Sequence, residues 1–276
     1  MPTHPSGPVT DPGRTPGLRL AELTTTALAA RLGRHEVVVL VPVGSVEPHG
    51  PHLPLATDTL IGEAVAAGAA EELARRGTDA LVAPSVAYGV TEFARGFAGA
   101  VSVANGTLTA MLARIATSLV GQGFRHVCFV SQHLEPAHEA EVRAAVAGLP
   151  HGSASVASPL SRRWGRLLSD EFKSGACHAG EYETSLVLAI APELCDHERA
   201  ATLTPLTVSL SDAIRAGKTS FAECGMPDAY TGAPARATAA HGREMLARLV
   251  ALTVAEVEQA LATATTRPPP SDLGAR

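Results

Sequence analysis

The feature that most constrains the fold of this chain is a run of β-branched residues, EVVVLVPV, at 36–43. The run lacks polar alternation, so the strand it forms must be buried on both faces. Shorter apolar runs at 80–84, 125–131 and 153–156 predict three more strands of the same kind. Strands buried on both faces are typical of parallel sheets that helices cover on two sides.

Segments with helical periodicity separate or follow these strands. A helix is expected in each of the ranges 20–32, 59–76, 107–121, 137–147 and 237–261. Alternating strands and helices imply crossover connections between parallel strands. The predicted fold class is therefore α/β, a three-layer α/β/α arrangement with a largely parallel central sheet. Ligands of such sheets bind outside the carboxyl ends of the strands, in the loops that lead into helices.

The composition fits one globular domain. Apolar residues make up 46% and charged residues 18% of the 276 positions, which is enough apolar material for a buried core. The segments 1–17 and 264–276 are rich in proline, glycine, serine and threonine, and we expect them to be disordered tails. Residues 18–263 are expected to form a single domain.

Charge and patterning exclude several classes of protein. With 22 Lys+Arg against 27 Asp+Glu the net charge is −5, and no basic block indicates a nucleic-acid partner. No apolar run approaches the roughly 18 residues of a membrane span. The four cysteines are widely spaced and form no C-x-x-C pair. We therefore expect a cytoplasmic protein with neither a membrane nor a nucleic-acid partner.

The loop after the first strand, at 44–58, gathers four side chains that can bind metals: Glu47, His49, His52 and Asp58. Residues two apart in an extended chain point the same way, so Glu47 and His49 can converge. Single residues have simpler interpretations, because Thr57 or Asp58 can cap the next helix and either histidine can be a hydrogen-bonded loop residue. Taken together, histidine and carboxylate donors predict a zinc, manganese or iron site.

A second pair with the same spacing follows the strand at 125–131. His133 and Glu135 lie in QHLEP, which again leads into a helix. Taken singly, Glu135 suits the first turn of that helix and His133 suits the protein surface. Two such pairs at the ends of neighbouring strands predict one shared site. A carboxylate bridging two ions about 3.5–4 Å apart would use five donors there: Glu47, His49, Asp58, His133 and Glu135. His126 and His138 are assigned structural roles, the latter on a helix surface.

A third cluster, CHAGEYETS at 177–185, precedes an apolar helical stretch. Glu183 or Thr184 can simply be the first residues of that helix. His178 and Glu183 are also candidates for acid–base chemistry, because imidazole titrates near neutral pH and a carboxylate can orient it. Nothing besides its histidine neighbour supports Cys177 as a nucleophile, and adjacent side chains usually diverge.

These three segments together resemble the creatininase family of creatinine amidohydrolase-like proteins. The matching motifs are VPVGSVEPHGPHLPLATD at 41–58, SQHLEP at 131–136 and HAGEYETS at 178–185. The resemblance spans roughly residues 20–260. It implies a dinuclear metal hydrolase that opens cyclic or linear amides and assembles as a ring-like homohexamer.

Matched motif by motif, the resemblance also implies the metal ligands. Glu47, Asp58 and His133 are similar to the ligands of one ion. His49, Asp58 and Glu135 are similar to the ligands of the other ion, which makes Asp58 the bridging residue. The cofactors expected are thus two divalent ions per chain, either zinc, manganese or iron.

The remaining site residues follow from the same motifs. His178 matches the family histidine implicated in proton transfer, and Glu183 matches the acidic residue of the same motif. Leu134, Cys177 and Glu92 are predicted to contact the substrate.

The predicted pocket departs from that of creatininases proper. Those enzymes place a tryptophan and acidic residues just before the catalytic histidine, whereas this chain has KSGAC at 173–177 and its only tryptophan, Trp164, lies upstream. The segment 88–100 resembles the family loop Gly-x-Ser-x-Glu-His…Phe-Pro-Gly-Thr, but Phe93 replaces the histidine and AGA at 98–100 replaces Pro-Gly-Thr. The ligands are retained while the pocket differs, which supports hydrolysis more strongly than creatinine as the substrate.

We therefore expect hydrolysis of a C–N bond in a small-molecule amide, other than creatinine and other than a peptide, by water activated between two ions. Three alternatives are a metal-dependent peptidase that trims a modified peptide, a deformylase acting on a biosynthetic intermediate, and a non-catalytic scaffold. Retention of all five donors argues against the scaffold, because buried charged groups without a use are costly.

Overall fold

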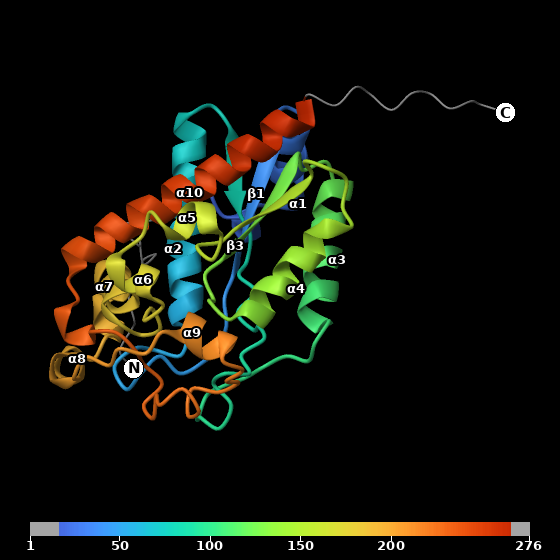
Figure 1. Cartoon of the computed structure of the whole chain (residues 1–276). Coiled ribbons are helices and arrows are strands. Elements are labelled where there is room, and N and C mark those ends of the chain that lie inside the picture. The colour runs from blue at the N-terminus through green and yellow to red at the C-terminus, as the bar shows by residue number, and fades with distance from the viewer. Residues whose placement is uncertain (1–16, 266–276) are drawn as a thin grey trace, which may run out of the picture.

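The computed structural model describes residues 17–265, and in this part of the chain four parallel strands lie between layers of helices (Figure 1). The strands are β1 (Val37–Val43), β2 (Asp79–Val82), β3 (His126–Ser131) and β4 (Ala154–Ala157). Their order in the sheet is β2-β1-β3-β4, and every neighbouring pair is parallel. The predicted three-layer α/β fold is confirmed, and the strand ends differ from the predicted ones by at most two residues.

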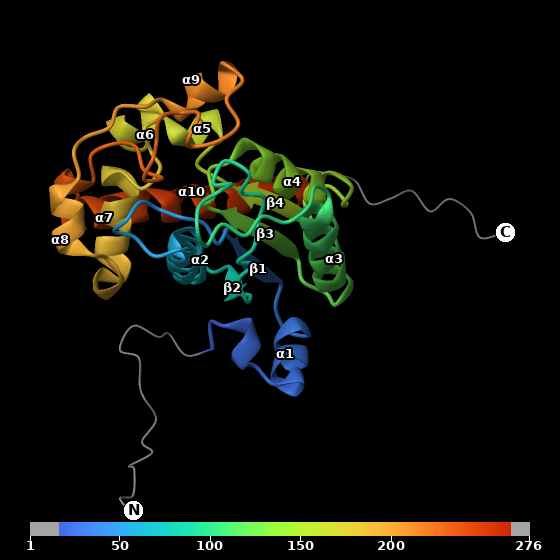
Figure 2. The same cartoon turned by 90° about the horizontal axis from the view of Figure 1, so that it is seen from below.

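The two faces of β1 explain why its sequence has no polar alternation. Val38 and Leu40 belong to a core shared with α2 (Thr57–Arg75) and α10 (Ala239–Thr265). Val39 and Val41 belong to the opposite core, shared with α3 (Thr107–Gly121) and α4 (Pro136–Ala147). Figure 2 shows the two helix pairs on either side of the sheet. Each valine or leucine buried in this way contributes about 1.5–3 kcal/mol.

The predicted helices are present, with two differences at their ends. The range 20–32 divides into a 3-10 turn at Leu20–Glu22 and α1 (Thr25–Leu32), because the hydroxyl of Thr24 accepts the N–H of Ala27 and caps α1. Helix α10 continues to Thr265, so the predicted tail at 264–276 begins in a helix. The rest of both predicted tails lies outside the described residues.

The segment after β4 holds elements that the sequence patterns did not predict. They are α5 (Arg162–Gly165), α6 (Asp170–Ser174), α8 (His197–Thr202), α9 (Leu210–Arg215) and 3-10 turns at Pro192–Leu194 and Pro234–Arg236. Only α7 (Glu181–Ile190) was expected. Helices α5, α6 and α9 are grouped on one side of the molecule (Figure 2). Within residues 17–265, none of the helices has both the length and the apolar character needed to cross a membrane.

Helix α10 crosses α7 at a glycine. A Cβ atom on Gly242 would overlap the backbone carbonyl of Ser185 in α7 and would lie 2.9 Å from the Cβ of Ala189. The Ser185 hydroxyl accepts the N–H of Thr238 at 3.1 Å, just before α10 begins. The absence of a side chain at 242 therefore allows the two helix backbones to approach closely.

The crossing predicts that Gly242→Ala lowers the free energy of unfolding by about 1–3 kcal/mol. Alanine is favoured over glycine inside a helix by about 1 kcal/mol, so helix propensity alone predicts the opposite sign. Urea denaturation measures the difference. Gly121→Ala is the control, because a Cβ at this last residue of α3 meets nothing within 4 Å. Equal or higher stability of Gly242→Ala would contradict the close crossing.

Candidate metal centre

The register of the sheet brings two of the sequence motifs together. Val43 pairs with Ser131, so β1 and β3 end at the same edge and their following loops leave the sheet side by side. The loop after β1 folds back on itself, and the N–H of Glu47 donates to the carbonyl of Leu55 at 3.2 Å. At its tip Gly50 has φ of +65°, and a Cβ there would lie 2.8 Å from the ring of His52, which only glycine avoids.

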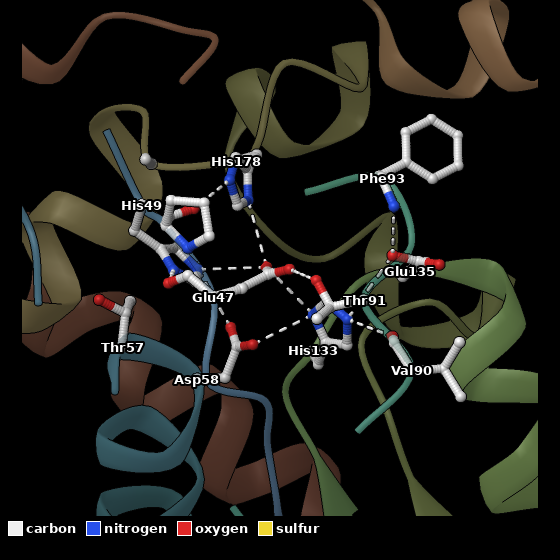
Figure 3. A network of polar contacts seen from close by, with 12 residues as sticks. Glu47, His49, Thr57, Asp58, Val90, Thr91, Phe93, His133, Glu135 and His178 are labelled. Atoms are coloured by element: carbon white, nitrogen blue, oxygen red, sulfur yellow. Dashed lines mark hydrogen bonds and ion pairs between the residues drawn. The ribbon is translucent and has the colours of Figure 1, made fainter. Parts of the chain in front are cut away.

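Four of the predicted ligands point toward one another at this edge (Figure 3). Asp58 lies between two histidines, with Oδ1 3.2 Å from His49 Nε2 and Oδ2 3.1 Å from His133 Nδ1. Glu47 Oε1 is 3.2 Å from His133 Nδ1. All four side chains are buried, so the donor atoms share one dry space. Each oxygen of the Asp58 carboxylate therefore approaches a different histidine.

Backbone carbonyls hold both histidines in the orientation that metal ligation requires. The Nδ1–H of His49 donates to the carbonyl of Glu47 at 3.2 Å, and the Nε2–H of His133 donates to the carbonyl of Val90 at 2.9 Å. A carbonyl can only accept, so the other nitrogen of each ring faces Asp58, and once the ring is neutral this nitrogen carries the lone pair that a metal ion needs. Ligating histidines in proteins are held by their second nitrogen in this way.

Two carboxylates occupy places that differ from those the family resemblance implied. Glu183 Oε2 lies 3.6 Å from His49 Nε2, and Glu183 forms a possible donor set with His49 and Asp58. Glu135 belongs to no such set among residues 17–265 and lies 4.0 Å from His133 Nε2. Its carboxylate instead accepts the N–H groups of Glu92 at 3.1 Å and Phe93 at 3.2 Å. By geometry, Glu183 rather than Glu135 completes the second set.

The charges in the cluster are strongly coupled. Burial lowers the pKa of His49 and of His133, but the neighbouring carboxylates have the larger combined effect. Asp58 and Glu183 help raise the pKa of His49 to about 10. Glu47 and Asp58 raise the pKa of His133 well above its usual range. Burial in turn raises the pKa of Glu183 to about 8. The buried carboxylates of the cluster therefore need positive charge nearby. Without a metal ion the protonated histidines provide it, and a divalent cation can provide it instead with both imidazoles neutral.

The donor set fits a metal ion on two further observations. His49 Nε2 and Asp58 Oδ2 are buried at the centre of the cluster, where they make ion-pair contacts but no well-oriented hydrogen bond. Imidazole nitrogen and carboxylate oxygen are the ligands that zinc, manganese and iron accept. These two buried atoms are thus those that an ion would engage.

His178 lies at the rim of this cluster. Its Nε2–H donates to the carbonyl of Pro48 at 3.0 Å, which leaves the unprotonated Nδ1 3.8 Å from Glu47 Oε1. Burial, with a smaller contribution from His49, lowers the pKa of His178 to about 4. The ring stacks on Phe221, with centroids 4.5 Å apart. His178 is therefore held as a neutral imidazole with one free acceptor nitrogen.

A cavity of about 580 Å³ opens beside the cluster. Glu47, His133, Glu135 and His178 form its polar end. Its other walls are largely apolar, and they include the side chains of Phe93, Leu134, Leu160, Phe172, Cys177, Leu210, Ile214 and Phe221. Leu134 and Cys177 thus lie where the sequence placed them, on the cavity wall. The Glu92 side chain does not line it, because that carboxylate accepts from Ser102 and pairs with Arg95.

Several simpler interpretations of single residues are wrong. Asp58 and Thr57 do not cap α2, since no side chain caps that helix and the Thr57 hydroxyl donates to the carbonyl of Pro54. His133 is buried rather than exposed, and so is His138, whose ring meets that of His133 edge-on at 4.7 Å. The simpler interpretation of His52 is correct, because it is a hydrogen-bonded loop histidine outside the cluster whose Nε2 bonds Thr184 Oγ1 at 2.8 Å. The last contact ties the loop after β1 to α7.

Sequence patterns missed three residues of the site. The Thr91 hydroxyl donates to Glu47, His138 packs on His133, and Phe221 stacks on His178. Thr91 lies in the loop singled out for its altered pocket residues, which was a usable signal. Phe221 lies in KTSFAECG, which carries no motif, so only its position in space reveals it.

Comparison with known proteins agrees with this geometry. The sequence matches the creatininase family (creatinine amidohydrolase) over residues 21–257. The chain belongs to the creatininase family. A mycofactocin precursor peptide peptidase of Mycolicibacterium smegmatis is 34% identical over 229 residues, 82% of this chain and 86% of that protein. A creatinine amidohydrolase of Pseudomonas putida is 27% identical over 206 residues, 68% of this chain and 77% of that protein.

Solved structures of the family confirm the fold. One described as "Creatininase Mn" superposes with a TM-score of 0.65 at 25% identity, covering 91% of this chain and 99% of that chain. Like other creatininase-family proteins, this chain is a hydrolase. Trp164 does not supply the tryptophan that creatininases proper place at the pocket, because its buried indole N–H donates to Glu256 and its side chain is not part of the cavity wall.

Of the three possible donor sets in residues 17–265, one of which joins His178 to Glu47 and His49, the two that share Asp58 predict how metal content responds to single substitutions. We expect about two ions per chain in the wild type, almost none in Asp58→Ala, and about one in Glu183→Gln. Glu135→Gln keeps both ions because its carboxylate lies outside the donor sets. Elemental mass spectrometry measures the content, with Glu92→Gln as the matched control. Loss of an ion from Glu135→Gln but not from Glu183→Gln would restore the assignment implied by family resemblance.

The raised histidine pKa values predict that metal binding competes with protons. Protonated His49 and His133 must lose their protons to become ligands, so binding of Mn²⁺ releases protons and its affinity falls as the pH is lowered from 8 to 6. Calorimetric titrations in two buffers with different ionisation enthalpies measure the proton release. Affinity that is independent of pH, without proton release, would contradict the two histidine ligands.

Proposed function

We propose that the protein is a dinuclear metal-dependent amidohydrolase that cleaves a C–N bond of a peptide or peptide-like substrate. The observation that carries the proposal is Asp58, buried between His49 and His133 at the polar end of a large apolar cavity. Glu47, Asp58 and His133 would hold one ion, and His49, Asp58 and Glu183 the other. When bound, such a pair of ions polarises an amide carbonyl and lowers the pKa of water.

Glu135 is suited to proton transfer from the attacking water. It lies on the cavity wall beside His133, and burial raises the pKa of its carboxyl. The N–H groups of Glu92 and Phe93 fix the carboxylate, so it faces the cavity in one orientation. A general base needs both a fixed position and a pKa closer to neutral than that of a free carboxylate. In this proposal Glu183, rather than the Glu135 implied by family resemblance, is the carboxylate that binds the second ion together with His49 and Asp58.

His178 is suited to give a proton to the departing nitrogen. Its anchored Nε2–H fixes the ring, and its free Nδ1 lies at the polar end of the cavity, where the amide would bind. Stacking on Phe221 prevents the ring from turning away. Nδ1 can take up the proton that Glu135 accepts from the water and pass it to the leaving nitrogen, so that one proton moves from water to the amine, as the proton-transfer role of the family histidine implies.

The substrate class follows from the cavity and the relatives. About 580 Å³ has room for a drug-sized molecule or for a segment of a few residues. The M. smegmatis relative at 34% identity is described as a peptide peptidase, whereas the P. putida creatinine amidohydrolase is 27% identical. A peptide substrate therefore replaces the small-molecule amide expected from the sequence, which becomes the second candidate.

The proposal includes a cytoplasmic location and a homohexamer. Four unpaired cysteines suit a reducing compartment. The hexamer rests on family resemblance, and light scattering on the purified protein tests it.

The role of His178 predicts that His178→Ala lowers kcat by about 10²–10⁴-fold while about two ions per chain are retained. Peptide pools digested with the metal-loaded enzyme and analysed by mass spectrometry identify cleavage, and amine release from small-molecule amides, formamides included, tests the second candidate. His35→Ala, at an exposed histidine outside the site, is the control. Unchanged turnover in His178→Ala would remove this residue from the reaction.

A further inference from the structure

Two arginines at the cavity carry charge that nothing in the described chain neutralises. Arg162, in α5, and Arg166, just after it, both line the cavity and are exposed. Within residues 17–265 neither side chain has a hydrogen bond or an ion pair. Arg162 begins α5, and Arg166 follows its last residue with helical backbone angles (φ −65°, ψ −15°), so both residues lie on the short stretch that lines the cavity.

The neighbouring cations differ in this respect. Arg163 lies between them in sequence, but its guanidinium stacks on Trp164 at 4.2 Å and donates to Gln259 of α10. Lys173, which also lines the cavity, pairs with Asp170 at 2.6 Å. Of these four cations, only Arg162 and Arg166 line the cavity, are exposed and have a guanidinium group without a hydrogen bond or ion pair within residues 17–265. A free guanidinium group of this kind matches a carboxylate in two hydrogen bonds.

The cavity thus has three chemically distinct parts. Its buried end holds Glu47, Glu135 and the two histidines, where the amide would bind. Leu160, Leu210 and Ile214 contribute an apolar wall. The exposed arginines lie at the mouth, because the polar end is buried and they are not.

We infer that Arg162 and Arg166 bind a carboxylate of the substrate, which selects substrates with an apolar segment and an anionic group on one side of the scissile amide. The inference rests on the proposed amide hydrolysis and assigns the specificity of the same site. The two arginines are binding residues remote from the reacting bond, so their loss raises KM more than it lowers kcat.

Binding of short blocked peptides to the zinc-loaded enzyme tests the inference without turnover. The probes are N-acetyl-Leu-Leu as free acid, the same dipeptide as amide, and N-acetyl-Leu-Asp amide, each titrated by calorimetry. We expect the wild type to bind a carboxylate-bearing probe about 10- to 100-fold more tightly than the neutral amide. Preference for the free acid identifies a terminal carboxylate as the recognised group, and preference for the Asp probe identifies a side-chain carboxylate.

The variants separate the arginines from the metal ions, which can also attract a carboxylate. In R162Q/R166Q the preference for the acidic probe falls to within about threefold of the neutral one, and in R162E/R166E it is lost or reversed. R163Q is the matched control and keeps the wild-type preference, because its side chain is engaged outside the cavity. An unchanged preference in R162Q/R166Q, with normal metal content, overturns the inference.

The proposed function fails in a different experiment. If the wild type binds the acidic probe through the two arginines but hydrolyses no peptide or formamide, the anion site stands and the hydrolase proposal falls. If peptides are cleaved at equal kcat/KM by wild type and R162Q/R166Q, the hydrolase proposal stands and the anion site falls.

Discussion

A carboxylate buried between two imidazoles is the interaction on which the rest of this structure depends. Asp58 can leave water only because His49 and His133 compensate its charge, and each histidine is in turn anchored to a backbone carbonyl. Such a group tolerates little displacement, because an unpaired buried charge is strongly destabilising. The fold must therefore hold two strand ends and the starts of two helices in a single arrangement.

The parallel sheet and one helix crossing meet that requirement. Equal register at Val43 and Ser131 brings the two loops to one edge of the sheet, and α2 begins there with Asp58. Glu183 arrives from α7, far along the chain, and α7 is held in place by the close crossing of α10 at Gly242. Stability of the α7–α10 packing and geometry of the metal centre are thus coupled, although no residue of α10 belongs to the centre.

The metal-binding atoms and the substrate-binding cavity wall come from different parts of the fold. The donor atoms come from positions adjoining strands and helices, where backbone hydrogen bonds limit movement. The cavity walls come largely from the segment after β4, whose short helices α5, α6 and α9 supply apolar and cationic side chains. Substitutions in these three short helices can thus change the cavity wall without touching the donor atoms, and relatives of this chain are described as a peptide peptidase and a creatinine amidohydrolase.

The sequence by itself determined the sheet and most of the centre, because these depend on local patterns. An unbroken β-branched run requires burial on both faces, and loops that follow neighbouring parallel strands leave the sheet at one edge, which brings Glu47, His49 and His133 together. Only the tertiary structure decided which carboxylate completes the second donor set, because Glu135 and Glu183 both lie in short motifs. Helix α7 places Glu183 beside His49. The N–H groups of Glu92 and Phe93 instead hold the Glu135 carboxylate toward the cavity. The same holds for Phe221 and for the arginines of α5, whose neighbours in space are remote in sequence. Contacts of that kind arise from packing between segments, which no pattern within one segment encodes.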